Sequence, residues 1–351
     1  MQMTQVRALL EGSQLNKLLV QVAGEKEATN LFTMIKVEDP LLAEQAGDIV
    51  SRMVLAQSMN MLLFVKNLEA VPDGKRYVED RLAAGGQVVF DHGALRTVAA
   101  ANTGELPQGE MAFKRFLEPL GFAVADVYPL GRLKMTGKAY CHKDAPELVT
   151  QFFVSELHVD QFSPAFQAAV NNVVSTSRDP LSPHAQALLK TLADKNQLAF
   201  SDAAKLLPEL VGCFNVQHTT PALADYQALL LESAEMAWIT TEGNAFNHAT
   251  DRVPDVFATA DELRAKGMPI KDKVEVSASG RVRQTAFKAV QVEREFIDEN
   301  GRRVTRIVPG SFYEFITRDR YNDNAGNNKL DLRFDSSNAQ GIFKMTDVSA
   351  C

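Results

Sequence analysis

The sequence predicts an α+β protein made of two similar β-rich halves, with helices before the first half and between the two. Three observations carry this prediction. A seven-residue pattern, F-[DN]-H-[GA]-x-x-R, occurs at residues 90–96 and again at 246–252. Each copy is followed, at a similar distance, by an apolar segment that contains a glutamate, Glu156 in the first half and Glu314 in the second. Helical and period-two segments also follow one another in a similar order in both halves, as an internal repeat requires.

Residues 1–84 are predicted to form a helical N-terminal segment. Leu15, Leu18 and Leu19 recur at spacings of three and four, which places them on one face of a helix. The Pro-Asp-Gly sequence at 72–74 is a turn signal between the later helices of this segment.

Residues 85–160 are predicted to form the first β-rich module. After Gly85-Gly86 the apolar residues alternate with polar ones, which is typical of strands. The order of the segments is β-α-β-β-β. The expected elements are a strand at 88–98, a helix at 110–120 and strands at 123–130, 133–142 and 151–159.

Residues 161–240 are predicted to be a helical insertion between the two modules. Two of its helices are expected to begin at Ser163-Pro164 and Ser182-Pro183. In each pair a serine can cap the helix and a proline suits its first turn.

Residues 241–351 are predicted to form the second module and a C-terminal tail. We expect a strand from Phe246, a helix at about 259–266, one long strand at 281–296 and a return strand at 303–318. An ordered segment is expected at 330–345, after a polar stretch. The four parts are expected to act as one integrated catalytic unit.

The repeated pattern points to a metal site. His92 and His248 occupy the same place in the two copies, and Glu314 lies between apolar residues near the end of the second half. A carboxylate in such surroundings is costly to bury without a cation. Two imidazoles and one carboxylate on one side of an ion leave coordination positions open, which is the arrangement of non-haem Fe(II) oxygenases.

Arg96 is a candidate catalytic and substrate-binding residue. It lies four residues beyond His92 on the same face of a strand, so the two α-carbons are about 13 Å apart at ~3.3 Å per residue. Its planar guanidinium could hold a substrate carboxylate through two hydrogen bonds. A structural salt bridge is the alternative for Arg96, and it is the expected role of Arg252 in the second copy.

Two further residues are candidates for the site. Glu156 could be a fourth metal ligand, which would favour isomerase or lyase chemistry, but we expect it to lie behind the ligands or to be structural. Gln284 lies on the predicted long strand and could reach a substrate, although polar residues in strands are more often solvated. The remaining histidines are expected to be surface or capping residues: His142, His158, His184 and His218.

Composition excludes several classes of partner. Lys and Arg total 37 and Asp and Glu total 44, a net charge of −7, which argues against binding of nucleic acid or of a membrane through a basic patch. Three cysteines without C-x-x-C spacing argue against a disulfide framework or a zinc ribbon and fit a reducing cytoplasm. The apolar runs are far shorter than the ~20 residues of a membrane span. A cytoplasmic protein is therefore expected.

Six short motifs, in this order, resemble the 2-oxoadipate dioxygenase/decarboxylase family, also called hydroxyglutarate synthases and related to the glyoxalases. They span most of the chain and are specific only as a set. They are D-H-G-A-L-R-T at 91–97, F-V-S-E-L at 153–157, A-W at 237–238 leading to N-H at 247–248, Q-T-A at 284–286, F-Y-E-F at 312–315 and G-I-F-K at 341–344.

The resemblance implies a vicinal-oxygen-chelate fold, in which paired β-α-β-β-β modules close around Fe(II). It implies that His92, His248 and Glu314 bind the iron and that Arg96 holds a substrate carboxylate. The implied reaction converts 2-oxoadipate and O₂ to 2-hydroxyglutarate and CO₂, a step of lysine catabolism. The small-molecule partners would thus be a 2-oxo acid and O₂.

Two alternatives remain open from the sequence. A glyoxalase-type isomerase or lyase would use Ni(II), Zn(II) or Mn(II), would need Glu156 as a fourth ligand and would not consume O₂. A non-catalytic module would use the paired motifs only to brace the two halves. The second alternative gives no reason for histidine and glutamate to recur together.

Overall fold

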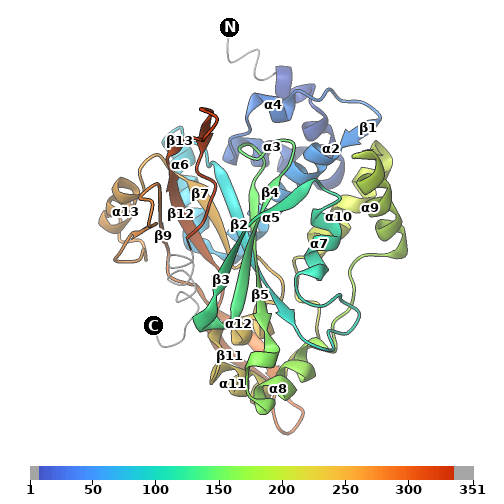
Figure 1. Cartoon of the computed structure of the whole chain (residues 1–351), viewed down its shortest axis with the longest axis vertical. Helices are drawn as coiled ribbons and strands as arrows, with labels where there is room; N and C mark the ends of the chain where they lie inside the picture. The colour runs from blue at the N-terminus through green and yellow to red at the C-terminus, as the bar shows by residue number, and fades with distance from the viewer. Residues whose placement is uncertain (1–7, 336–351) are drawn as a thin grey trace.

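A curled eight-stranded sheet forms the centre of the computed structural model, which describes residues 8–335 (Figure 1). The strands lie in the order β3-β4-β5-β2-β7-β12-β9-β8. Their bounds are Phe122–Leu130 for β3, Met135–His142 for β4, Gln151–His158 for β5, Phe90–Ala99 for β2, His248–Arg252 for β7, Phe312–Arg318 for β12, Val282–Ala286 for β9 and Glu275–Val276 for β8. The predicted α+β class is confirmed.

The sheet has the internal symmetry that the repeated pattern predicts. In the first half β2 pairs in parallel with β5, and in the second half β7 pairs in parallel with β12. The two halves meet where β2 and β7 pair antiparallel, with Ala94 opposite His248 and His92 opposite Thr250. The two copies of the seven-residue pattern therefore lie side by side at the centre of the sheet.

The first module follows its prediction closely. The order is β2, α7 (Met111–Leu117), β3, β4 and β5, with boundaries within a few residues of those expected. The buried aromatic residues of α7, Phe113 and Phe116, pack against Phe214 from the helical insertion. This contact ties the insertion to the first module.

The second module corrects one prediction. The expected long strand at 281–296 is two strands, β9 and β10 (Gln291–Ile297), and the expected return strand is also two, β11 (Arg303–Pro309) and β12. Strands β10 and β11 form a separate hairpin. The break falls at Pro309-Gly310, since proline has no N–H to donate to a ladder.

The hairpin leaves the sheet because it packs elsewhere. Phe296 and Val308, which lie on its two strands, form a small apolar cluster with Tyr226 and Ala237 from the insertion. Figure 1 shows the hairpin at the lower end of the molecule, near α11 and α12. Helix α13 (Val256–Ala265) occupies the place predicted for the helix of the second module.

The N-terminal segment is helical, as predicted, and covers one face of the sheet. Helix α5 packs against the sheet, and its Phe64 contacts Phe90 of β2 and Tyr313 of β12. A short strand, β1, interrupts the helices and pairs with β6 from the insertion. The bounds are Gln14–Ala23 for α2, Glu25–Met34 for α3, Asp39–Leu42 for α4, Ile49–Ser51 for β1, Arg52–Ala70 for α5, Pro72–Ala83 for α6 and Gln197–Ala199 for β6.

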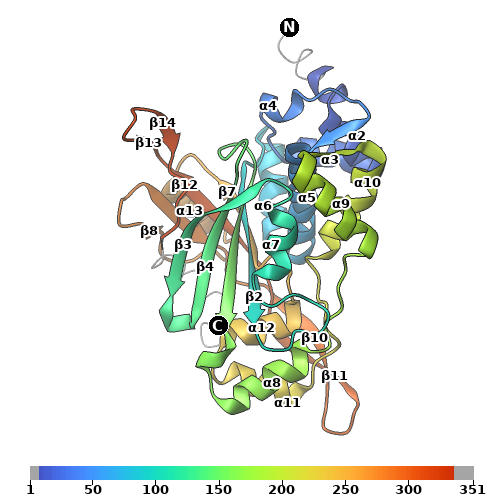
Figure 2. The same cartoon turned by 45° about the vertical axis from the view of Figure 1, so that its right-hand side comes forward.

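The helical insertion divides between two ends of the molecule (Figure 2). Helices α9 and α10 lie beside the N-terminal helices, whereas α8, α11 and α12 lie at the opposite end. The predicted caps are confirmed, because the hydroxyl oxygens of Ser163 and Ser182 accept hydrogen bonds from Phe166 N and Ala185 N. The bounds are Pro164–Val174 for α8, Pro183–Lys195 for α9, Phe200–Gly212 for α10, Leu223–Leu230 for α11 and Ala234–Glu242 for α12.

A small hairpin of β13 (Arg320–Asn322) and β14 (Asn328–Leu330) follows the sheet. Beyond Asp335, the segment predicted at 330–345 lies outside the described residues. No helix within residues 8–335 combines the length and the apolar character needed to cross a lipid bilayer.

Candidate metal centre

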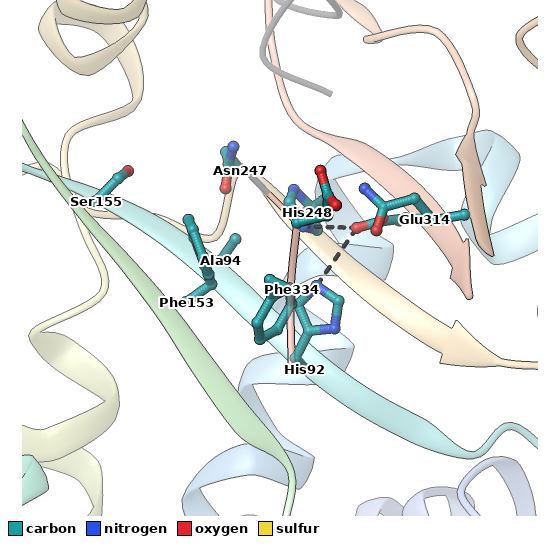
Figure 3. Close-up of a pocket in the computed structure, with 10 residues that line it drawn as sticks. His92, Ala94, Phe153, Ser155, Asn247, His248, Glu314 and Phe334 are labelled. Atoms are coloured by element: carbon teal, nitrogen blue, oxygen red, sulfur yellow. Dashed lines mark ion pairs between the residues drawn. The ribbon is translucent and has the colours of Figure 1, made fainter. Parts of the chain in front are cut away.

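Three buried side chains from three adjacent strands converge on one point: His92 of β2, His248 of β7 and Glu314 of β12 (Figure 3). Glu314 Oε2 lies 2.8 Å from Nε2 of His248 and 3.4 Å from Nε2 of His92. One potential ligand atom from each residue lies within 4.8 Å of the others. The structure thus brings together the three residues that the sequence predicted as metal ligands.

The register of the strands explains this convergence. Thr250 of β7 lies opposite His92 of β2 on one side and opposite Glu314 of β12 on the other. Because His248 lies two residues before Thr250, all three predicted ligands point to the same face of the sheet. The face is fixed by backbone pairing alone.

Thr250 also contacts the cluster directly, which the sequence analysis missed. Its hydroxyl donates to Glu314 Oε2 at 3.0 Å and lies 3.2 Å from Nε2 of His92. The available signal was its place in the second copy of the pattern, two residues after His248 and on the same face. The hydroxyl holds the carboxylate between the two imidazoles.

The electrostatics of the cluster favour a bound cation. Burial disfavours the charge on Glu314, but the neighbouring imidazoles of His248 and His92 hold the pKa of this carboxyl below its usual range. Among residues 8–335, Glu314 Oε1 and His248 Nδ1 are buried and make no hydrogen bond. Two imidazole nitrogens and a carboxylate form a donor set that fits a divalent first-row transition metal ion.

Asp91 fixes the orientation of His92. Its Oδ1 lies 2.9 Å from Nδ1 of the imidazole, so Nε2 is directed toward Glu314. Nε of Arg318 donates to both oxygens of Asp91 at 3.0 and 3.1 Å, and Nη1 of Arg252 lies 3.8 Å from the same carboxylate. Arg252 therefore has the salt bridge expected for it. Despite burial, Arg318 and His92 hold the pKa of Asp91 below its usual range.

A pocket opens beside the cluster, and part of its wall comes from the segment after the sheet. Phe334 lies edge-on to the ring of His92, with centroids 4.8 Å apart, and packs against Phe153 at 4.9 Å. The free space of this pocket measures about 30 Å³. The other residues that line it are Ala94, Ser155, Asn247, Gln284 and Asp335. Gln284 was predicted, but Phe153, Ser155, Asn247 and Phe334 were not assigned to the site.

Arg96 lies near this pocket but does not line it. Its side chain is fully buried, and its guanidinium carbon lies 4.9 Å from the centre of the Trp238 ring. Burial lowers the pKa of Arg96 to about 10, and the nearby Glu235 partly offsets this effect. Arg96 is paired with Ser155 in the ladder between β2 and β5. Arg96 therefore lies on β2 two residues beyond Ala94 and beside Ser155, both of which line the pocket.

Glu156 does not belong to the cluster. It is opposite Thr97 in the ladder, and Thr97 faces away from His92 because it lies an odd number of residues along β2. Glu156 Oε2 accepts a hydrogen bond from the backbone N–H of Glu110 at 2.7 Å. In the first half, the strand position equivalent to that of Glu314 is occupied by Phe153, which lies opposite Ala94. Glu156, three residues later, was predicted to be the counterpart of Glu314, and this prediction was wrong.

His142 was predicted to be a surface or capping residue, and this prediction was wrong. Its imidazole is fully buried at the end of β4, with Nε2 3.0 Å from the carbonyl oxygen of Leu120. Burial lowers its pKa to about 4. Gly121, which has a φ of +97°, leaves the room that this ring occupies.

Two pseudo-symmetric modules with a buried group of two histidines and one carboxylate define a protein of the glyoxalase type with a candidate metal site. The chain belongs to the 2-oxoadipate dioxygenase/decarboxylase family, whose sequence model matches residues 53–344. This agrees with the resemblance seen in the sequence.

Individual relatives agree with this assignment. The chain is 24% identical over 309 residues to a chloroplastic/amyloplastic 2-oxoadipate dioxygenase/decarboxylase of Oryza sativa subsp. japonica, covering 80% of this chain and 77% of the relative. A glyoxalase superfamily protein from Ralstonia eutropha JMP134 is 52% identical, with a TM-score of 0.86 over 92% of this chain and 98% of that one. The fold also matches hydroxyglutarate synthase from Oryza sativa in complex with 2-oxoadipate, with 20% identity and a TM-score of 0.63 over 84% and 92% of the chains.

Proposed function

We propose that this protein is an Fe(II)-dependent dioxygenase that decarboxylates a small 2-oxo acid, with 2-oxoadipate as the expected substrate and 2-hydroxyglutarate and CO₂ as the products. The reaction balances with O₂ as the only other reactant, since both of its oxygen atoms are retained in the products. The observation that carries the proposal is the convergence of His92, His248 and Glu314 in a member of this family.

In this proposal the three side chains hold Fe(II) on one face. When bound, the ion supplies the sites at which a 2-oxo acid and O₂ can be brought together and activated. Asp91 keeps Nδ1 of His92 protonated and leaves Nε2 as the ligand atom. Thr250 holds the carboxylate of Glu314 in place.

The remaining residues of the pocket bind substrate and exclude water. Phe153 and Phe334 form an apolar wall over the histidines. The amides of Gln284 and Asn247 face the same space and can donate to oxygens of the substrate, whereas the hydroxyl of Ser155 donates to the carbonyl oxygen of Leu95 and can only accept. Arg96 supplies a fixed positive charge beyond Ser155, which suits the second carboxylate of a dicarboxylic acid.

The isomerase or lyase alternative receives no support from the geometry. It required a fourth protein ligand, Glu156, and this residue lies on the opposite face of the sheet. Two further expectations stay predictions: a cytoplasmic location, and the absence of nucleic-acid and membrane partners. The rice relative bears a name that assigns it to plastids.

The test is oxygen uptake by protein loaded anaerobically with Fe(II), mixed with 2-oxoadipate in air-saturated buffer, with 2-hydroxyglutarate assayed in the same sample. We expect one molecule of product for each O₂ consumed. His248→Ala should abolish both signals, whereas His158→Ala, a histidine outside the site, should change neither. Uptake only with other 2-oxo acids would keep the proposed reaction class but show that 2-oxoadipate is not the substrate. Iron binding without uptake on any 2-oxo acid would overturn the proposal.

A further inference from the structure

Asp335 is a charged residue of the metal pocket to which the proposed reaction gives no role. In the described part of the chain, the titratable side chains that line this pocket are His92, His248, Glu314 and Asp335. The first three are the candidate metal ligands. Asp335 belongs to the segment after the sheet and is half-buried. A carboxylate is an unexpected wall for a pocket that binds an acid, because like charges repel.

Contacts with both edges of the curled sheet fix the position of Asp335. Its Oδ2 accepts a hydrogen bond from the backbone N–H of Ala278 at 3.1 Å, and Ala278 lies in the turn between β8 and β9. The preceding residue is held at the other edge, where the N–H of Phe334 donates to the hydroxyl oxygen of Tyr128 of β3 at 2.9 Å. Strands β3 and β8 are the two end strands of the sheet. The segment therefore joins the two edges and holds the charge of Asp335 at the pocket.

A fixed carboxylate in this pocket stabilises a bound cation. Glu314 supplies the one carboxylate among the three candidate ligands, so a divalent ion in their cluster keeps a net positive charge. The carboxylate of Asp335 cancels this charge. Charges interact more strongly in a partly dry pocket than in water, because the effective dielectric constant is lower. The affinity for metal should therefore depend on Asp335, although this residue lies outside the group of ligands.

The same charge opposes the binding of an anionic substrate. The C1 carboxylate of a 2-oxo acid would bring a net negative charge to the pocket, and a second carboxylate would add another. The amides of Gln284 and Asn247 can donate hydrogen bonds to these groups, but they are neutral. Arg96, the proposed partner of the second carboxylate, does not line the pocket and has Glu235 nearby. Repulsion by Asp335 should therefore weaken a dianion more than a monoanion.

We propose that Asp335 determines how the metal pocket discriminates between ligands by charge. Its carboxylate strengthens the binding of a divalent metal ion by the cluster of two histidines and Glu314, and it weakens the binding of a second carboxylate on a 2-oxo acid. The inference rests on the proposed function for the class of ligand, a 2-oxo acid at the metal centre. It does not depend on the reaction with O₂.

The first test measures metal affinity in Asp335→Asn. This variant removes the charge but keeps the size of the side chain and an oxygen that can accept from the N–H of Ala278. We expect the dissociation constant for Co(II), followed through its visible absorption, to rise about 10-fold. Asp335→Glu keeps the charge and should bind Co(II) nearly as the unaltered protein does. Asp272→Asn removes the same charge from an exposed position outside the pocket and should leave the affinity unchanged.

The second test measures the binding of two acids to the Co(II)-saturated protein in the absence of O₂. The acids are 2-oxoadipate and 2-oxohexanoate, which have the same chain length but differ in the far carboxylate. Isothermal titration calorimetry gives the two dissociation constants. We expect Asp335→Asn to bind 2-oxoadipate about 10-fold more tightly than the unaltered protein does, and 2-oxohexanoate to gain less. A purely structural role of Asp335 would instead weaken the binding of the metal and of both acids together.

The outcomes separate this inference from the proposed function. Weaker metal binding together with tighter binding of 2-oxoadipate in Asp335→Asn would support the inference. Weaker binding of the metal and both acids, equal gains for both acids, or unchanged affinities would overturn it. Failure of both acids to bind the unaltered, Co(II)-loaded protein would overturn the inference and the proposed function together. The expected change in acid binding, without O₂ uptake by the Fe(II)-loaded protein on any 2-oxo acid, would overturn the proposed function alone.

Discussion

Arg318 connects the orientation of a predicted metal ligand to the closure of the pocket. Its Nε lies 3.0 and 3.1 Å from the two oxygens of Asp91, which in turn holds Nδ1 of His92. Its Nη1 donates to the carbonyl oxygens of Asp331 and Arg333 at 2.9 and 2.7 Å. The guanidinium carbon is also 4.9 Å from the ring centre of Phe334. One buried side chain therefore supports both the imidazole and the segment that covers it.

Replacing Arg318 with Met should weaken binding of a divalent metal ion by about 10- to 100-fold, the usual effect of removing a group that orients a ligand. The reason is that Asp91 would lose its main cationic partner inside the protein. The dissociation constant for Co(II), followed through its visible absorption, measures the effect without any need for turnover.

The control for this prediction is Arg320→Met. Arg320 lies two residues away and pairs with Glu147 at a partly exposed position. We expect its metal affinity to match that of the unaltered protein. A normal affinity in Arg318→Met would show that Asp91 orients His92 without Arg318.

Thr250→Val tests the role of the hydroxyl at the centre of the cluster. The replacement keeps the shape of the side chain but removes the donor to Glu314 Oε2. We expect a loss of metal affinity of about 10- to 100-fold, since a hydrogen bond to a buried charged group contributes about 1.5–3 kcal/mol. Thr241→Val is the control, because Thr241 donates to the carbonyl oxygen of Trp238, away from the cluster. An unchanged affinity in Thr250→Val would mean that the two imidazoles alone position Glu314.

Sequence patterns predicted the parts of the fold that local rules determine. The strands and helix of the first module appeared with nearly the expected bounds, and Ser163 and Ser182 cap helices as expected. The repeat also led directly to the cluster of His92, His248 and Glu314. Alternation and capping depend only on residues close together in the sequence. A single histidine would not indicate a metal ligand, but two histidines at the same place in a repeated pattern do.

The errors come from register and tertiary packing, which the sequence does not state. Glu156 was matched to Glu314 by similar surroundings, but strand pairing gives that place to Phe153. Pro309-Gly310 marked a break in the predicted return strand, but the sequence could not show that the β10–β11 hairpin would pack on the insertion instead of extending the sheet. Phe334 was missed because its contact with His92 joins residues distant in the chain.

If the protein acts as proposed, Phe334→Ala should widen the range of 2-oxo acids that it converts. The ring of Phe334 lines the pocket and packs on His92 and Phe153, so it narrows the space in which a substrate would lie. Truncation of the ring widens this space but admits water. We expect the ratio of kcat/KM for longer over shorter 2-oxo acids to rise and the coupling of O₂ uptake to product to fall. Phe257→Ala, at an exposed position on α13, is the control. A ratio that stays constant would show that Phe334 does not limit substrate size.

The last prediction concerns stability and depends on Asp251, which lies on β7 and faces away from the metal centre. Its Oδ2 accepts a hydrogen bond from the hydroxyl of Tyr77 at 2.6 Å, and its Oδ1 accepts one from the backbone N–H of Val89 at 2.9 Å. Burial raises the pKa of Asp251 from 3.8 to about 6, even though Tyr77 and Arg81 act in the opposite direction. The folded protein therefore holds this proton more tightly than the unfolded chain does.

The sign of the effect follows from that shift. The contribution of Asp251 to stability is fully present below about pH 4 and is lost as the pH rises through about 6. A shift of about two units corresponds to about 3 kcal/mol. Asp251→Asn cannot titrate, so the free energy of unfolding of the unaltered protein, minus that of the variant, should fall by about this amount between pH 4 and pH 7. Urea unfolding at several pH values measures the difference. Asp194→Asn, at an exposed site on α9, is the control. If the difference in the free energy of unfolding between the unaltered protein and Asp251→Asn did not change with pH, the fold would stabilise the carboxylate of Asp251 as well as its acid form.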